Sequence, residues 1–174
     1  MKYARAIFRL IRLGLTLGRG AARITLAGRD PVEAVQETAA RIARVMNVDL
    51  RILGTPPNRG LVVSNHLGYL DIVVLAATAP SVFVAKSEIR RWPVFGWFAR
   101  RSGCIFVDRE SSASAGRSVR AIRAALNRGR RVILFPEGTS SGGAGVLPFR
   151  SSLLEPAVGQ PLTIAAVRYG LDPG

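Results

Sequence analysis

The only histidine of the chain, His66, lies in a polar segment between two apolar runs, residues 61–63 and 72–75. The first run is typical of a buried strand and the second of the start of a helix, and α/β proteins place their sites where strands end. Histidine is the side chain whose ordinary pKa suits proton transfer near neutral pH. Asp71 follows five residues later and could orient the imidazole and balance its charge. Together, such a base and carboxylate can deprotonate a hydroxyl.

This pairing has alternatives. His66 could be a hydrogen-bonded structural histidine, and Asp71 could act only as a helix N-cap. Residues five apart on a straight helix diverge by about 140°, so a contact between the two side chains requires the chain to bend. Gly68 lies between them and would permit the bend. We therefore expect the contact only if the segment turns before the helix begins.

Polar residues also follow three other apolar runs. They are Lys86, the pair Asp108 and Arg109, and residues 137–141. The carboxyl ends of parallel strands share one edge of a sheet, so these residues could lie close to His66. Together they would supply a base, a carboxylate, two cations and a turn of backbone N–H groups. Such cations can hold a phosphate, although Arg109 alone could be a surface charge and the turn at 136–138 a plain one. One histidine and one cysteine cannot supply the usual ligands of a metal, so we expect no metal.

Apolar runs and helical periodicity alternate along most of the chain. The predicted strands cover residues 48–53, 61–63, 82–85, 104–107, 132–135 and 162–167, and the predicted helices cover residues 31–46, 71–79 and 112–128. This alternation predicts an α/β fold with a mostly parallel sheet and helices on both faces. The 174 residues suffice for one such domain with a sizeable core.

The first 29 residues carry only positive charges. At about 100° per residue, one narrow face of a helix collects Arg5, Arg9, Arg12, Thr16, Arg19 and Arg23. Apolar residues fill the remaining surface, which is typical of a helix lying in a membrane interface with its arginines toward lipid phosphates. The alternative is a surface helix that packs on the protein's own core. We predict amphipathic membrane-associating helices over residues 1–47 and a second domain over residues 48–174.

The net charge of +14 indicates an anionic partner, which could be nucleic acid, a membrane surface or phosphorylated substrates. The basic residues belong to no nucleic-acid motif, so we expect no nucleic-acid partner. The longest apolar run, residues 72–85, is shorter than the roughly 20 residues that a transmembrane helix needs. Arginines also interrupt the N-terminal segment where a signal peptide would be apolar. Cys104 lies in an apolar run, which favours a small packing residue over a reactive thiol.

Three segments together resemble the glycerolipid acyltransferases, the family of 1-acylglycerol-3-phosphate acyltransferases. Residues 65–71 (NHLGYLD) resemble the family's H-x4-D block, residues 103–109 (GCIFVDR) its second block, and residues 135–140 (FPEGTS) its third. Residues 147–149 (LPF) are similar to the segment that usually follows. The blocks come in the family's order, and the resemblance covers the chain from about residue 50 onward.

The resemblance implies a mechanism and its partners. His66 would take a proton from a lysolipid hydroxyl, Asp71 would hold the imidazole, and the hydroxyl would attack an acyl thioester directly. The acyl thioester, carried by coenzyme A or by acyl-carrier protein, would be a co-substrate, and no cofactor is implied. The resemblance assigns the acceptor's head group to Arg109 and the turn Glu137, Gly138, Thr139 and Ser140, with Lys86 as an addition. It also implies peripheral or monotopic attachment to the cytoplasmic face of a bacterial inner membrane.

The acceptor stays open between two lipids. Phosphatidate synthesis from 1-acylglycerol-3-phosphate is the first expectation, but Ser140 stands where many phosphate-accepting members carry arginine. Residues 140–152 look more like members that acylate lyso-ornithine lipid. The family's fourth block is matched only loosely by residues 164–167, and the chain stops soon afterwards, so we expect a C-terminally truncated domain. A non-catalytic membrane-binding module is the second alternative, based on the N-terminal arginines.

Overall fold

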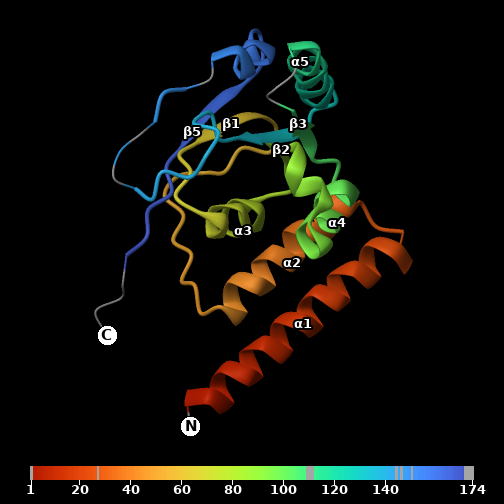
Figure 1. Cartoon of the computed structure of the whole chain (residues 1–174), viewed down its shortest axis with the longest axis vertical. Coiled ribbons are helices and arrows are strands. Elements are labelled where there is room, and N and C mark those ends of the chain that lie inside the picture. Colours follow the sequence, from red (N-terminus) through yellow and green to blue (C-terminus); the bar gives the residue numbers. More distant parts are fainter. Residues whose placement is uncertain are drawn as a thin grey trace.

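The computed structural model describes residues 2–26, 28–108, 112–143, 145, 147–149 and 151–170. Figure 1 shows the chain from the N-terminal helix to the last strand. The helices are α1 (Lys2–Leu26), α2 (Pro31–Val45), α3 (Tyr69–Thr78), α4 (Pro93–Arg101) and α5 (Ser112–Asn127), with short 3-10 helices at Ser87–Arg91, Ser151–Leu153 and Glu155–Ala157. The strands are β1 (Gly60–Ser64), β2 (Val82–Lys86), β3 (Ile105–Val107), β4 (Arg131–Leu134) and β5 (Leu162–Ala165).

The five strands form one sheet in the order β3-β2-β4-β1-β5, and every neighbouring pair is parallel. The two strands β1 and β4 are buried along their whole length, which explains why they read as continuous apolar runs. Because all the strands are parallel, their carboxyl ends meet at one edge. The connection from β1 through α3 to β2 passes over β4, so β1 and β4 lie side by side at the centre of that edge.

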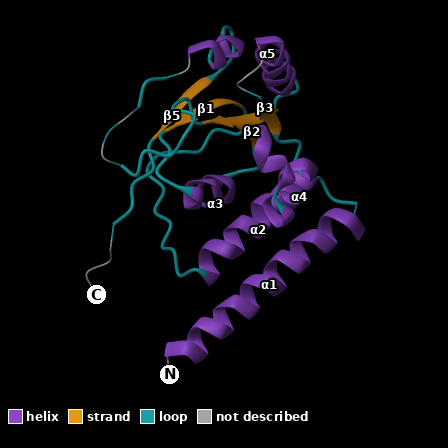
Figure 2. Cartoon of the chain, viewed as in Figure 1, coloured by secondary structure: helices purple, strands orange, loops and turns teal. Residues whose placement is uncertain are grey.

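Helices cover both faces of the sheet (Figures 1 and 2). On one face, α5 packs through Ile122 and Leu126 on Leu61 and Leu134. On the other, α3 packs through Leu75 on side chains of β1 and β4, α2 packs on α3, and α1 packs on α2. The predicted fold class, a parallel sheet with helices on both faces and an amphipathic N-terminal helix, is confirmed.

The predicted start of α2 is confirmed in detail. The Asp30 side chain accepts a hydrogen bond of 2.8 Å from the backbone N–H of Val32, and Pro31 occupies the first helical position. Salt bridges also hold α2 in place. Glu37 of α2 pairs with Arg23 of α1 and with Arg29 of the segment between the two helices. The division of the chain at residue 47 stays a prediction.

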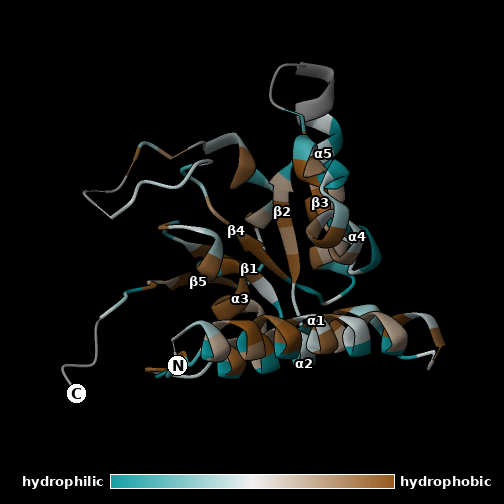
Figure 3. Cartoon of the chain, turned by 60° about the horizontal axis from the view of Figure 1, so that its bottom comes forward, coloured by the Kyte–Doolittle hydropathy of each residue, from teal (hydrophilic) through white to brown (hydrophobic). Residues whose placement is uncertain are grey.

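The helix α1 has three faces. One face packs on α2, where an added Cβ at Gly20 would lie 2.4 Å from the Thr38 hydroxyl. The arginines form the second face, and a third face of large apolar side chains is exposed to solvent. Hydrophobic and hydrophilic positions alternate along the ribbon of α1 in Figure 3. None of the helices in the described part of the chain combines the length and hydropathy that crossing a membrane requires.

The strand predicted at residues 48–53 is wrong, because this segment has no regular secondary structure. It lies over a cavity of about 570 Å³ between α3 and the end of β5, and it pairs with none of the described strands. Its alternating apolar residues are consequently exposed, and Leu53 is 97% exposed.

Candidate functional site

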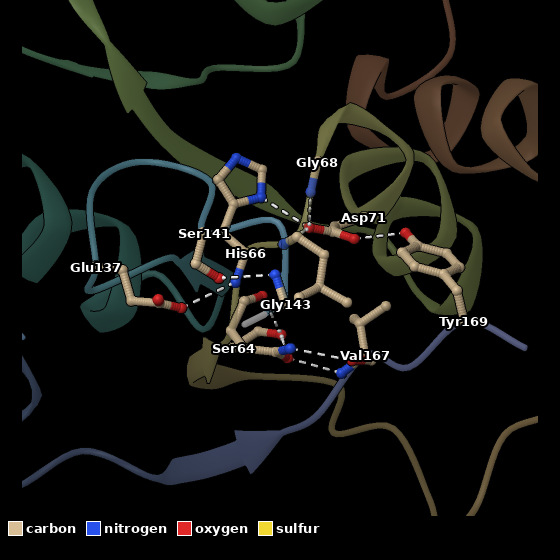
Figure 4. Close-up of polar contacts among 11 residues, drawn as sticks. Ser64, His66, Gly68, Asp71, Glu137, Ser141, Gly143, Val167 and Tyr169 are labelled. Carbon is tan, nitrogen blue, oxygen red and sulfur yellow. Dashed lines mark hydrogen bonds and ion pairs between the residues drawn. The ribbon is translucent and has the colours of Figure 1, made fainter. Parts of the chain in front are cut away.

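His66 and Asp71 are brought together by the turn that joins β1 to α3 (Figure 4). The His66 Nδ1 atom lies 2.8 Å from Asp71 Oδ2. The same oxygen accepts hydrogen bonds from the backbone N–H groups of Leu67, at 2.5 Å, and Gly68, at 2.9 Å. Asp71 therefore closes the turn at the start of α3 and holds the imidazole at once. Gly68 is in extended backbone conformation, which any residue can adopt, so the bend comes from these bonds and not from the freedom of glycine.

The imidazole is held on its other side by an aromatic ring. His66 stacks on Phe135, the residue that follows β4, with ring centroids 4.1 Å apart and planes 18° from parallel. Only 15% of the His66 side chain is exposed, and the Asp71 side chain is fully buried. A carboxylate only accepts hydrogen bonds, so an Nδ1–H directed at Asp71 leaves the lone pair on Nε2 available as a base.

Glu137 lies on the far side of the His66 backbone from Asp71 (Figure 4). Its Oε1 atom accepts a hydrogen bond of 3.1 Å from the backbone N–H of His66, and Oε2 accepts one of 2.9 Å from the backbone N–H of Leu147. The backbone N–H of Ser141 donates to the carbonyl of His66 at 2.9 Å. The turn after β4 is thus fastened to the turn after β1. The predicted role of Glu137 at an acceptor's head group stays a prediction, and the observed partners of its carboxylate are backbone groups.

A largely apolar cavity of about 270 Å³ leads away from His66 between α2, α3, α4 and β2. Its interior is lined by Ile42, Ile72, Ala76, Phe83, Phe98 and Cys104. Seven exposed residues mark its rim, namely Lys86, Thr139, Ser140, Tyr69, Trp92, Val94 and Phe95. The cavity therefore places the imidazole between an apolar channel and a polar opening.

The structure brings together most of the predicted site residues. His66, Lys86, Gly138, Thr139 and Ser140 line this one cavity, as expected for strand ends that share an edge. Arg109 lies outside the described residues.

Cys104 also lines the cavity, as a half-buried residue just before β3. Burial raises the pKa of its thiol to about 12, so the thiol stays protonated near neutral pH. A protonated thiol is a poor nucleophile, which supports the packing role predicted for this residue.

Two contacts at this edge are absent from the sequence prediction. The Asn65 side chain pairs with the backbone of Val167, donating through Nδ2 at 3.0 Å and accepting through Oδ1 at 2.8 Å. Tyr169 donates its hydroxyl to Asp71 Oδ1 at 2.5 Å. A signal for Tyr169 was available, since it is a polar residue shortly after the last predicted strand, in the position that singled out the others.

The chain is similar to several known proteins. A family model described as "Acyltransferase" matches residues 36–170. The chain is 37% identical over 142 residues to the 1-acyl-sn-glycerol-3-phosphate acyltransferase of Neisseria meningitidis, covering 78% of this chain and 55% of the relative. It is 33% identical over 173 residues to the lyso-ornithine lipid O-acyltransferase of Pseudomonas aeruginosa, covering 93% of this chain and 67% of the relative.

A solved structure is also similar. The crystal structure of the 1-acyl-sn-glycerophosphate acyltransferase PlsC from Thermotoga maritima superposes with a TM-score of 0.63 at 28% identity, covering 91% of this chain and 73% of that chain. The chain spans about half the length of the first curated relatives, 55% in one case and 45% in another.

Proposed function

The chain belongs to the acyltransferase family, and on that premise we propose that it transfers a fatty acyl group from an acyl thioester to the free hydroxyl of a lysolipid. The observation that carries the proposal is the imidazole of His66, oriented by a buried carboxylate 2.8 Å away and facing an apolar cavity. An apolar channel next to a base suits a long acyl chain whose reactive carbonyl must meet a hydroxyl.

In this mechanism, His66 Nε2 removes the proton from the acceptor hydroxyl, and the hydroxyl oxygen attacks the thioester carbonyl carbon. The new C–O bond forms, the C–S bond breaks, and the leaving thiolate takes the proton back from the imidazolium. Asp71 stabilises the imidazolium while it carries the proton, as an orienting carboxylate does in other base-catalysed acyl transfers. Coenzyme A or acyl-carrier protein leaves as the free thiol, and no cofactor or metal takes part.

We infer that the acceptor is 1-acylglycerol-3-phosphate, which would give phosphatidate. Lys86 stands on the cavity rim with His66 and could meet a phosphate there, with Arg109 as a second cation. The second candidate is lyso-ornithine lipid, which is favoured by Ser140 and by the similarity to proteins that carry that name. Ser140 lines the rim as well, so it is placed to contact either head group.

Attachment to an anionic membrane surface is the third part of the proposal. The exposed apolar face of α1 lies beside a face of arginines, and this combination suits a helix in the interface of a bilayer. A lysolipid could then reach the cavity without leaving the membrane. We propose that the enzyme is a peripheral or monotopic protein at the cytoplasmic face of a bacterial inner membrane.

The test is acyl transfer by the purified chain in vesicles. Labelled acyl-CoA or acyl-carrier protein is offered with 1-acylglycerol-3-phosphate or lyso-ornithine lipid, and the diacylated product is separated and counted. We expect one acceptor to be diacylated, and we expect the Asp71→Asn variant to lose this product. If neither acceptor is acylated while the chain still binds the vesicles, the chain is a non-catalytic membrane-binding module and the proposed function is wrong.

A further inference from the structure

The carboxylate of Asp71 is fully buried, yet hydrogen-bond donors surround it. Three of the donors are local: the backbone N–H groups of Leu67 and Gly68 and the ring of His66 all meet Oδ2. The fourth is distant in sequence, because the hydroxyl of Tyr169 meets Oδ1 across 98 residues of chain. A buried charge is costly unless donors replace the lost water, and Tyr169 supplies the donor for the second oxygen.

The segment that carries Tyr169 is fixed by a contact of its own. The two hydrogen bonds between the Asn65 side chain and the Val167 backbone tie the end of β5 to the end of β1, next to His66. Two residues beyond this tie, the chain delivers the Tyr169 ring to α3 (Figure 4). The position of the phenol therefore depends on the same strand ends that carry the base.

Tyr169 approaches Asp71 from the side away from the substrate. It lines the cavity beneath residues 48–57 and is not among the residues around the channel that opens at His66. The ring thus contacts the carboxylate without lining the proposed acyl channel. A contribution of Tyr169 to the reaction would have to pass through Asp71.

We propose that Tyr169 is a positioning residue for the proton transfer, holding Asp71 Oδ1 so that Oδ2 stays directed at His66 Nδ1. The terminal torsion of an aspartate is soft and two-fold, so a carboxylate held at only one oxygen could turn. A donor on the other oxygen opposes that turn and keeps Nε2 of the imidazole facing the cavity. This role rests on the proposed function, in which His66 is the base.

The hydroxyl can act as a donor over the whole working range of pH. Burial and the neighbouring Asp71 raise the pKa of Tyr169 above its ordinary value, so the phenol stays protonated. Other charged groups lie on both sides of the pair. Glu137 accepts the His66 backbone N–H, Lys86 lies on the rim of the His66 cavity, and the cavity on the Tyr169 side is lined by Asp49, Arg51, Arg131 and Arg168. The side-chain hydrogen bond that Asp71 Oδ1 accepts comes from Tyr169.

The decisive variant is Tyr169→Phe, which removes the hydroxyl and keeps the ring. Without the phenol, Asp71 loses a donor and becomes a stronger acceptor for its proton and for the imidazole N–H, so the pair holds its proton to higher pH. We expect kcat/KM for acyl transfer to fall roughly tenfold, as for the loss of one hydrogen bond to a charged group. We also expect the acidic limb of the pH–rate profile to move upward by about half a pH unit.

A second readout does not need turnover. Because His66 is the only histidine, labelling with ring-¹³C,¹⁵N histidine gives one set of imidazole signals, whose titration can be followed directly by NMR. The midpoint should move upward in Tyr169→Phe and stay unchanged in Tyr3→Phe, a matched control whose ring is 87% exposed on α1. If no thioester is ever turned over, the proposed function fails, but this titration still decides the role of Tyr169.

Two further variants separate the hydroxyl from the ring. In an Asp71→Asn background, Tyr169→Phe should not shift the His66 titration any further, because the two residues act as a unit. The inference is overturned if Tyr169→Phe leaves both the rate and the His66 titration unchanged. It is also overturned if only Tyr169→Leu lowers activity, since the ring's packing and not its hydroxyl would then matter.

Discussion

The exposed apolar face of α1 should determine how strongly the chain binds a bilayer. Phe8 is 59% exposed and Ile11 is 55% exposed, and both lie on the face that α2 leaves uncovered. Burying such a side chain completely is worth about 1.5–3 kcal/mol, so burying the exposed half of each gives about 1.5–3 kcal/mol for the two. The double variant Phe8→Gln/Ile11→Gln should therefore bind vesicles roughly 10- to 150-fold more weakly. Glutamine is a good helix former, so α1 itself should persist.

The assay is flotation with vesicles that contain anionic lipid, at increasing lipid concentration. A control replaces two apolar residues outside α1 that are even more exposed, Val158→Gln with Ile164→Gln, which are 75% and 83% exposed. This control should bind like the unaltered chain. If both double variants bind equally, or if neither binds less than the unaltered chain, α1 does not hold the protein on the membrane.

The remaining predictions concern stability and reactivity. Glu137→Gln should lower the free energy of unfolding by about 1–3 kcal/mol in denaturant titrations, because the amide nitrogen cannot accept the backbone N–H that the buried carboxylate accepts; an unchanged midpoint would contradict this. Gly60→Ala should destabilise by more than about 2 kcal/mol, since Gly60 has φ +92° and an added Cβ would lie 2.4 Å from a backbone carbonyl. Gly14→Ala on α1, with nothing within 4 Å, should instead stabilise by about 0.5–1 kcal/mol. The pKa of Cys104 is raised from about 9 to about 12, so the folded state holds this proton more tightly than the unfolded state. Stability should therefore fall as the pH rises above 9, and iodoacetamide at pH 8 should alkylate the native thiol far more slowly than the unfolded one; equal rates would show that the thiol is accessible.

Much of the site could be predicted because it depends on one rule of parallel sheets. Apolar runs located the strands, and polar residues after them were expected to converge at one edge, where His66 and Ser140 do line one cavity. The contact between His66 and Asp71 was predicted from their residue types and their spacing of five, on the condition that the segment between them turns. The structure shows that Asp71 itself makes this turn, through its bonds to backbone N–H groups.

The remaining features depend on contacts that no local pattern contains. Tyr169 meets Asp71 two residues beyond the point where Asn65 ties two strand ends together, across about 100 residues of chain. The alternation at 48–53 satisfied the period of a strand, but a strand also needs a pairing partner, and this segment pairs with none of the described strands. Glu137 was predicted to bind the acceptor's head group, which stays a prediction; that its buried carboxylate accepts two backbone hydrogen bonds depends on distant segments and could not be predicted from the sequence.

The most direct test of the account is the rate of acyl transfer by His66→Ala, measured beside the unaltered chain across pH 5–9 with the folding of both verified. General-base catalysis contributes about 10²- to 10⁴-fold, so kcat/KM should fall by that factor, and the acidic limb that the imidazole causes should disappear from the profile. A folded His66→Ala variant that acylates the lysolipid at the original rate, with the same acidic limb, would contradict the role of this histidine as the base.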